Sequence, residues 1–262
     1  MQTVTGNTKE EQTMLSSKEI TKKWETIANG KASLSVANLL LLGILAGMFI
    51  AFGALGSTVV SSGVGGGLGK LLGACVFPTG LILVVMAGAE LFTGNCLMAG
   101  PALFGKVKWT GVLKNWVLVY LGNMCGAFLL SALVYHSGLM ANADLVAAAK
   151  SIAANKCALP FGEALLRGIG CNILVCGAVW MASGAQNAGG KAVCCFFPIM
   201  LFVVCGFEHS VANMYYIPLG MQLGAESASM SGYLLSNLLP VTLGNILGGA
   251  GLGMIYAANY HD

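Results

Sequence analysis

The stretch Gly88-Ala-Glu-Leu-Phe-Thr-Gly-Asn95 places a glutamate and small polar residues in the middle of an otherwise apolar segment. The stretch Gly206-Phe-Glu-His-Ser-Val-Ala-Asn213 does the same 118 positions later (206 − 88), and both read Gly-x-Glu-x4-Asn. We interpret the repetition as a duplicated membrane protein in which each half contributes one interrupted helix. The two interruptions are expected to meet at a shared polar centre, which indicates a permeation pathway.

The composition identifies an integral membrane protein. Of 262 residues, 56% are hydrophobic and only 9% are charged, and the mean hydropathy is +0.79, whereas ordinary globular chains carry roughly a quarter charged residues. Four intervals contain no Lys, Arg, Asp or Glu: residues 32–69, 115–143, 168–190 and 227–261. Each can hold the ~20 apolar residues that cross a hydrocarbon core, and such continuous runs favour helices over barrel strands.

Two more apolar intervals are interrupted only by Glu90 and by the pair Glu208 and His209. We therefore predict an all-α membrane domain over residues 36–257, between an N-terminal segment 1–35 and a short tail 258–262. Six helices are expected near residues 36–60, 71–103, 112–136, 160–182, 192–222 and 231–257. Three helices in each half, about 36–137 and 160–257, make the repeats inverted, with the second and fifth helices broken.

The third and sixth predicted helices test the duplication independently. Asn115, Leu121-Gly122-Asn123 and Gly126 match Asn237, Leu243-Gly244-Asn245 and Gly248 at a constant offset of 122 (237 − 115). The Gly-x3-Gly spacing in both segments lets helix backbones approach closely, which is how helices embedded in lipid gain packing energy.

The N-terminal segment is polar and lacks the apolar core and cleavage site of a secretory signal. Ile20, Trp24, Ile27 and Ala28 recur at helical spacing, which fits a helix along the membrane face or, equally, an ordinary solvated helix. The positive-inside bias predicts both termini in the cytoplasm and a location in the cell membrane. Nine basic residues fall on the terminal side (Lys9, Lys18, Lys22, Lys23, Lys31, Lys106, Lys108, Lys114, Lys191) and four on the other (Lys70, Lys150, Lys156, Arg167).

Ionisable residues inside membrane helices are costly and usually functional. Glu90 and Glu208 hold equivalent repeat positions, so we expect a structural role for both, in which the carboxylates accept hydrogen bonds from amides freed at the helix breaks. Proton carriage by the glutamates is the alternative. The glycines and asparagines that share the motif are expected to build the same breaks: Gly88, Gly206, Asn95 and Asn213.

His209 has no counterpart in the first repeat, where Leu91 stands in its place. A neutral imidazole can donate a hydrogen bond to an anion and exchange a proton with a weak acid, although a packed histidine bonded to a carbonyl is the plainer alternative. Thr93 and Ser210 supply one hydroxyl to each break. Asn172 is a further polar side chain on an apolar helix, and it could equally bridge two helices.

Other classes of function find little support. The nine cysteines are an odd number spread over apolar helices, so packing is preferred to a disulfide framework, a metal site or redox chemistry. The glycine-rich residues 63–69 lack the Gly-Lys-Ser/Thr ending of a phosphate loop. An intramembrane hydrolase using His209 and Ser210 is disfavoured because adjacent helical residues point to different sides and no nucleophile elbow is present. No enzyme activity, cofactor or nucleic-acid partner is expected.

Three stretches together carry a resemblance to the formate/nitrite transporter family. They are Ala87-Gly-Ala-Glu-Leu-Phe-Thr-Gly94, Gly168-Ile-Gly-Cys-Asn-Ile-Leu-Val-Cys176 and Gly206-Phe-Glu-His-Ser-Val-Ala-Asn213. Gly94 stands where some members have serine, and Glu90 where some have aspartate. The resemblance implies an aquaporin-like inverted repeat without Asn-Pro-Ala motifs, in a homopentamer with one pore in each protomer.

The resemblance also implies roles for individual residues. Thr93 and His209 match the polar centre, with Asn172 as the partner of the histidine, and Lys156 matches a basic residue of the outer vestibule. Apolar positions of the pore are matched by Leu81, Phe202, Phe77, Phe92 and Val175. We expect a channel for small monovalent anions of weak acids such as formate, nitrite or hydrosulfide, with a neutral-solute channel of the aquaporin type as the alternative.

Overall fold

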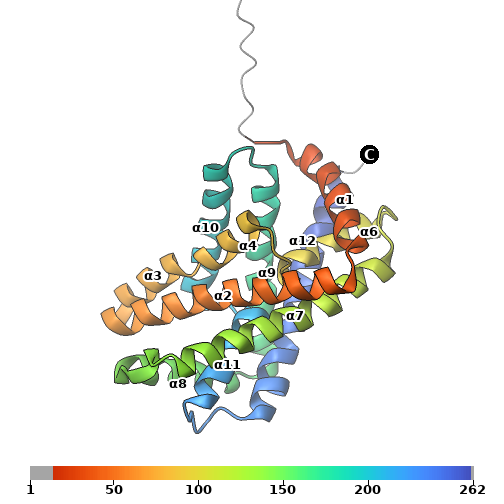
Figure 1. The fold of residues 1–262 in the computed structure, drawn as a ribbon. Helices are drawn as coiled ribbons and strands as arrows, with labels where there is room; N and C mark the ends of the chain where they lie inside the picture. The colour runs from red at the N-terminus through yellow and green to blue at the C-terminus, as the bar shows by residue number, and fades with distance from the viewer. Residues whose placement is uncertain (1–13, 261–262) are drawn as a thin grey trace, which may run out of the picture.

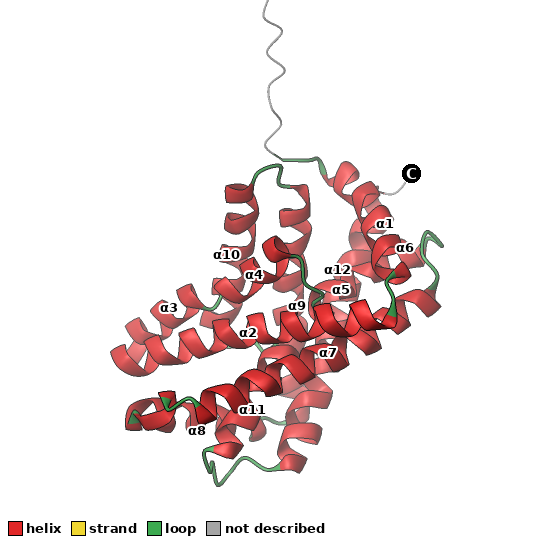
Figure 2. Cartoon of the chain, in the orientation of Figure 1, coloured by secondary structure: helices red, strands yellow, loops and turns green. Residues whose placement is uncertain are grey.

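The computed structural model describes residues 14–260, and their regular structure is helical apart from one isolated bridge between Met14 and Ala185 (Figures 1 and 2). This confirms the all-α fold expected from the continuous apolar runs. The parts of the predicted terminal segments that cover residues 1–13 and 261–262 lie outside the described residues.

Helix α1, Ser17–Ser33, begins at a capping box: the Glu19 amide donates to the Ser16 hydroxyl, and the Ser16 amide donates to the Glu19 carboxylate. Ile20, Trp24 and Ala28 are buried along one face. The helix packs on the protein itself, mainly against α7, α9 and α12. One direct contact is a 3.0 Å hydrogen bond from the Trp24 indole to the Ser183 hydroxyl at the end of α9. The sequence had indicated a helix on the membrane face or in solvent.

The first half of the chain continues with two long helices and several short ones. Their bounds are α2 Val36–Val64, α3 Gly66–Val76, α4 Thr79–Ala87, α5 Phe92–Asn95, the 3₁₀ turn η1 Cys96–Met98, α6 Ala99–Leu103 and α7 Trp109–His136. Helices α2 and α7 cross the molecule side by side in Figure 1.

The second half repeats this order after a short connection. Its elements are the 3₁₀ turn η2 Leu139–Ala141, α8 Ala143–Cys157, α9 Phe161–Gly184, α10 Ala188–Cys205, α11 Ser210–Gln222, the π-helical segment η3 Gly232–Leu238 and α12 Leu239–Tyr260. Helices α9 and α12 pack against each other as α2 and α7 do.

Within residues 14–260, six helical segments are long and apolar enough to cross a membrane: Val36–Val64, Gly66–Ala87, Trp109–His136, Phe161–Gly184, Ala188–Cys205 and Gly232–Tyr260. The six predicted spans are therefore confirmed in number. Leu41, Leu129 and Leu247 each expose more than half of their surface on these helices, as expected for side chains that face lipid or a neighbouring protein.

Both predicted helix breaks are present. Helix α4 ends at Gly88 and α10 ends at Gly206, and both glycines adopt the left-handed conformation, with φ of 84° and 73°. A left-handed residue ends a helix, and glycine adopts it without a steric penalty. The chain then runs extended for a few residues before α5 and α11 begin, so each half carries one interrupted helix.

Close glycine contacts hold the long helices together. A Cβ atom on Gly126 would overlap the carbonyl oxygen of Ile44 on α2, and one on Gly248 would overlap that of Ile169 on α9. The two contacts are repeat equivalents, since both offsets lie near 122 to 125 (248 − 126 and 169 − 44). The backbone approach predicted from the Gly-x3-Gly spacing is present in both halves. The opposite orientation of the halves in a bilayer, the likeness to aquaporins and the domain boundaries stay predictions.

Candidate functional site

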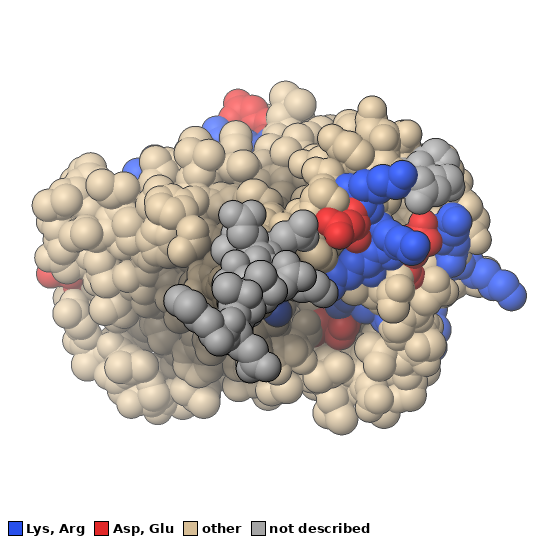
Figure 3. Space-filling model, turned by 90° about the horizontal axis from the view of Figure 1, so that it is seen from above, with Lys and Arg blue, Asp and Glu red and all other residues tan. Residues whose placement is uncertain are grey.

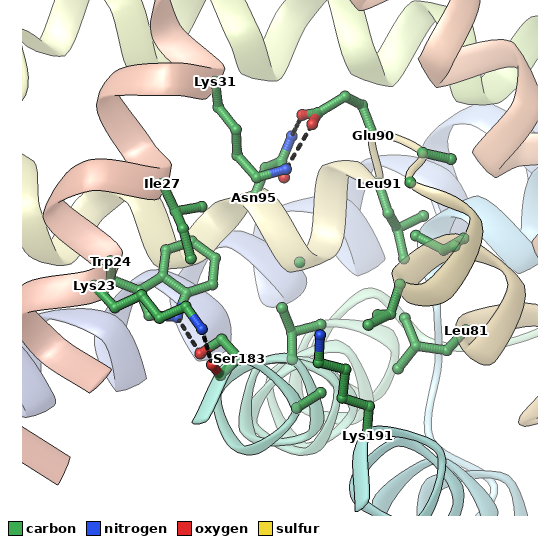
Figure 4. A pocket seen from close by; sticks show the side chains of 17 residues that line it. Lys23, Trp24, Ile27, Lys31, Leu81, Glu90, Leu91, Asn95, Ser183 and Lys191 are labelled. Atoms are coloured by element: carbon green, nitrogen blue, oxygen red, sulfur yellow. Dashed lines mark hydrogen bonds and ion pairs between the residues drawn. The ribbon is translucent and has the colours of Figure 1, made fainter. Parts of the chain in front are cut away.

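Two cavities with charged linings approach the centre of the molecule from different sides. The Lys31 cavity, about 360 Å³, lies beneath α1 and is lined by residues that include Lys31, Leu81 and Glu90 (Figure 4). The Lys156 cavity, about 220 Å³, lies beside α8 and is lined by residues that include Lys156 and Glu208. On the face of the molecule that is seen from above, basic side chains gather on one side together with a smaller number of acidic ones (Figure 3).

A buried polar network surrounds Glu90 at the first break. The Lys31 ammonium donates to the Glu90 carboxylate at 2.6 Å, and the Asn95 amide donates to the same carboxylate at 2.7 Å. Asn95 also donates to Asn115 on α7 at 2.8 Å, and Asn115 donates to the Lys31 carbonyl at 3.4 Å. Lysine, glutamate and two asparagines thus tie α1, the break and α7 together.

The same network recurs around Glu208 at the second break. The Lys156 ammonium donates to both carboxylate oxygens, at 2.8 and 2.9 Å, and Asn213 donates at 2.6 Å. Asn213 also donates to Asn237 at 2.7 Å, and Asn237 donates to the Lys156 carbonyl at 3.1 Å. Lys156 is the vestibule residue implied by the family resemblance, and its side chain lies over the Tyr216 ring, 5.5 Å from the centroid.

Two further asparagines satisfy the backbone where the helices are broken. The Phe92 amide donates to Asn123 at 2.9 Å, and Asn123 donates to the carbonyl of Glu90. In the second half the Ser210 amide donates to Asn245 at 2.9 Å, and Asn245 donates to the carbonyl of Glu208. These contacts correct the prediction that the glutamate carboxylates bind the freed amides. Each carboxylate instead binds a lysine ammonium, which neutralises its buried charge, and an asparagine side chain, which adds a neutral hydrogen bond.

His209 lies at the start of α11 and contacts both breaks. Its Nδ1 accepts a 3.1 Å hydrogen bond from the Ala212 amide, as an N-cap side chain does, and its Nε2 lies 2.9 Å from the Thr93 hydroxyl. Since Nδ1 is an acceptor, the neutral ring carries its proton on Nε2 and donates it to Thr93. The Thr93 hydroxyl therefore keeps its own proton for another acceptor. The histidine and threonine selected from the sequence are brought together.

Asn172 has different partners from those implied by the resemblance. Its side-chain amide donates to the carbonyls of Thr93, at 3.1 Å, and Asn245, at 2.6 Å, whereas the hydrogen bonds of His209 go to Thr93 and Ala212. The partnership with His209 is thus corrected: Asn172 holds the backbone that presents Thr93. Its buried Oδ1 has no hydrogen-bond partner among the described residues.

The apolar residues selected for the pore divide into two groups. Phe77 and Phe202 line the Lys156 cavity with their rings 5.5 Å apart, and Leu81 lines the Lys31 cavity. Phe92 instead packs its ring against Trp116 and Tyr120 of α7, and it lines neither cavity. Val175 is buried and also lines neither, so both stay predictions without support from the cavities.

The Thr93–His209 pair lies between the two cavities. His209 lines the Lys156 cavity, and Gly94, which follows Thr93, lines the Lys31 cavity. Thr93 itself is fully buried. Ser210 forms no hydrogen bond with His209, and its hydroxyl has no hydrogen-bond partner among the described residues.

Sequence reasoning missed several members of the networks. Lys31 was counted only for orientation, and four asparagines were used only as markers of the repeat: Asn115, Asn123, Asn237 and Asn245. A signal was available, because Lys31 and Lys156 each lie near the end of a short helix before a long apolar one and are 125 positions apart (156 − 31). Applying the repeat offset to every polar residue would have found them.

Six apolar helices within residues 14–260, two satisfied helix breaks and two cavities on either side of a buried polar pair indicate a multi-pass membrane protein of the channel and transporter class. The family model for the formate/nitrite transporter matches residues 18–258. The chain therefore belongs to the formate/nitrite transporter family, as the three sequence stretches indicated.

Comparisons with individual proteins point to the same family. A probable formate transporter from Methanothermobacter thermautotrophicus is 41% identical over 250 residues, which cover 87% of this chain and 90% of that protein. A solved pentameric formate channel with formate bound is similar in structure, with a TM-score of 0.75 and 34% identity over 87% of this chain and 98% of that chain. A solved ion channel of the same family has a TM-score of 0.86 at 27% identity and covers 92% of this chain and 98% of that one.

Proposed function

We propose that this protein is a membrane channel for formate and other small monovalent anions of weak acids, such as nitrite or hydrosulfide. The observation that carries the proposal is the arrangement of the site, in which two lysine-containing cavities are separated by apolar residues and one buried Thr93–His209 pair. Support also comes from the family and from two formate-handling relatives. By analogy with the pentameric relative, we propose that five protomers assemble, each with its own pore.

The first step is attraction of the anion into a cavity. Lys31 and Lys156 each lie near a mouth, and their pairing with Glu90 and Glu208 keeps the ammonium groups in place. A charged permeant gains electrostatic energy where water is partly excluded, because the effective dielectric constant is lower there than in bulk water. We infer that the two lysines concentrate anions at the two ends of one path.

The second step is passage between the cavities. Leu81 on one side and Phe77 with Phe202 on the other strip water from the permeant, and loss of hydration raises the pKa of the conjugate acid of the anion. The Thr93 hydroxyl, which accepts from His209, donates a hydrogen bond to the permeant at this point. The proton that the permeant takes up passes through the His209 imidazole, which regains a proton from water on the entry side. An anion that takes up a proton crosses as the neutral acid and releases the proton on the far side.

This step explains why a weak acid is the expected substrate. A strong-acid anion such as chloride cannot take up a proton at the barrier, so its full desolvation cost remains. Flux should therefore follow both the gradient of the anion and the gradient of protons. Both termini are proposed to lie in the cytoplasm of the cell that carries the channel in its membrane.

Flux measurements in proteoliposomes test the proposal. Formate, nitrite, hydrosulfide, lactate and glycerol are compared over a series of pH values, with chloride as the control anion. We expect flux of the weak-acid anions to rise as the pH falls, and the variants His209→Ala and Thr93→Val to lose most of it. Equal flux of glycerol and formate at every pH would instead favour the neutral-solute channel.

A further inference from the structure

The two cavities differ in net charge. Three lysines line the Lys31 cavity, namely Lys23, Lys31 and Lys191, against one acidic residue, Glu90, which leaves two positive charges in excess (3 − 1). The Lys156 cavity has one lysine and one glutamate, which pair with each other. Attraction of a monovalent permeant needs no such difference, because Lys31 and Lys156 already occupy equivalent positions.

Neither of the two additional lysines forms an ion pair with an acidic residue in the described part of the chain. Lys23 of α1 donates to the Ser183 carbonyl at 2.7 Å, a neutral group that leaves its charge uncompensated. Lys191 belongs to the first turn of α10, is half-buried, and forms no ion pair within residues 14–260. Figure 4 shows Lys23 reaching from α1 on the left toward Ser183, and Lys191 extending from a different helix at the bottom of the view.

We propose that the Lys31 cavity binds a small multivalent oxyanion, a diphosphate or a polycarboxylate, that bridges Lys23 and Lys191 and blocks the pore from that side. Two ammonium groups on different helices suit two separate anionic groups, each held by charge-assisted hydrogen bonds. A cavity of about 360 Å³ has the size of an ordinary small-molecule site. The blocking part of this proposal rests on the proposed channel function, whereas binding does not.

A multivalent anion is held rather than transported. The cost of removing an ion from water rises with the square of its charge, so a dianion meets a far larger barrier than formate at the apolar residues beyond Leu81. Single protonation still leaves such an ion charged. The ligand would also connect α1 to α10, because Lys23 and Lys191 belong to these two helices, and so stabilise α1 over the mouth.

Binding is tested first, without any transport, by thermal unfolding of the full-length protein in detergent with pyrophosphate as the probe. Ionic strength is matched with sodium chloride, because salt screens exposed charges. We expect pyrophosphate to raise the Tm of the wild type, and the variants Lys23→Gln and Lys191→Gln each to need about tenfold more pyrophosphate for the same shift. The matched control is Lys22→Gln, because Lys22 is exposed on the same helix and does not line the cavity.

Equal shifts in the wild type and the Lys23→Gln, Lys191→Gln double variant would overturn the site, and so would an equal loss in Lys22→Gln. Blocking is tested next in oriented vesicles by formate flux, normalised to the flux of each variant without pyrophosphate. Block should occur only from the Lys31 side, and equal block from both sides would overturn it. If the wild type carries no formate at all, the proposed function fails, while the Tm shifts still decide whether the site exists.

Discussion

The two halves of the molecule use the same contacts at their helix breaks and different residues at the centre. Lys31 with Glu90 and Lys156 with Glu208 form equivalent ion pairs, each completed by two asparagines. Where the second half has His209, the first has Leu91. The duplicated ion pairs and asparagines thus stabilise the two interrupted helices, and the central positions can therefore differ between the halves.

The two halves also differ at the position of Asn172. Gly47 is the repeat equivalent of Asn172, since both pairs Gly43 with Gly168 and Gly47 with Asn172 are 125 positions apart (168 − 43 and 172 − 47). A Cβ on Gly47 would overlap the Asn123 carbonyl oxygen, whereas Asn172 donates to the equivalent carbonyl of Asn245. One half therefore brings two backbones into contact at the point where the other inserts a polar side chain that also holds Thr93.

Removal of the glutamates should have the largest effect and tests whether the two networks are equivalent. In Glu90→Ala and Glu208→Ala the partner lysine is left partly buried and unpaired, which destabilises proteins by about 3 to 5 kcal/mol. Both carboxylates are more than 90% buried. We expect similar losses of unfolding free energy in both variants, measured by denaturant unfolding in detergent.

The control for the glutamates is Glu163→Ala, because Glu163 pairs with Arg167 on an exposed helix surface and such pairs contribute only about 0.3 to 0.5 kcal/mol. A loss at Glu208 several times larger than at Glu90 would show that the networks are not equivalent. A double variant, Lys31→Met with Glu90→Leu, is expected to recover much of the stability, because both charges are removed. If it unfolds as easily as Glu90→Ala, the unpaired lysine is not the cause of the loss.

The asparagines at the breaks should have the next largest effect. Asn123→Ala removes the hydrogen-bond partner of the Phe92 amide, and Asn245→Ala removes that of the Ser210 amide. A buried amide without a partner costs about 1 to 3 kcal/mol of unfolding free energy. We expect equal losses of unfolding free energy in the two variants. Asn259→Ala is the control, because that exposed side chain bonds only to its own helix. If either break variant is as stable as this control, the asparagine does not support its break.

The sequence was sufficient to predict most of the fold, and the reason is physical. Hydrocarbon requires about 20 apolar residues for each crossing, so six spans follow from the long apolar intervals, and the two helix breaks follow from the paired motif. The position of α1 was harder to predict, because its apolar spacing fits a helix on the membrane face, a solvated helix or a helix packed on the membrane domain. Contacts with distant residues decide between them, namely those of Trp24 and Lys23 with Ser183 and of Lys31 with Glu90.

For the site, the residue types could be predicted but not all of the pairings. Glu90 and Glu208 were identified because an ionisable residue in an apolar run is conspicuous, and His209 because it breaks the repeat. Asn172 was expected to pair with His209 but donates to the carbonyls of Thr93 and Asn245, since an amide can donate to many acceptors and spacing does not choose between them. Lys31 was overlooked because a lysine in a polar segment is ordinary until its partner is known.

Substitution of the N-cap residues His209 and Leu91 should have a smaller effect on stability. It tests the difference between the two halves at the centre of the molecule. Asparagine is a good N-cap, so His209→Asn retains the bond to the Ala212 amide but is too short to reach Thr93. We expect unchanged thermal stability and a fall in formate flux of about tenfold, equivalent to about 1.4 kcal/mol. Leu91→Asn at the equivalent position should leave the pH dependence of flux unchanged. Wild-type flux in His209→Asn would limit the histidine to capping.

The smallest expected effect compares the two helices that carry the lysines. α1 begins at the Ser16 and Glu19 capping box, and the hydrogen bonds from Ser16 hold the pKa of the Glu19 carboxyl below its usual range. α8 begins at Asn142, whose carboxamide accepts from the Asp144 and Leu145 amides and does not titrate. A depressed folded-state pKa stabilises α1 above the unfolded value of about 4.3, and that stabilisation is lost as the pH falls through the folded value.

Hydrogen exchange at the first-turn amides measures this difference. Below about pH 4, protection in α1 should fall relative to protection in α8, after correction for the intrinsic pH dependence of exchange. Glu19→Gln is the control, because glutamine completes the same capping box without a titrating group; its α1 should keep the same protection relative to α8 at every pH. If wild-type α1 and α8 lose protection together on acidification, both changes reflect opening of the whole molecule and not the cap of the helix that presents Lys31.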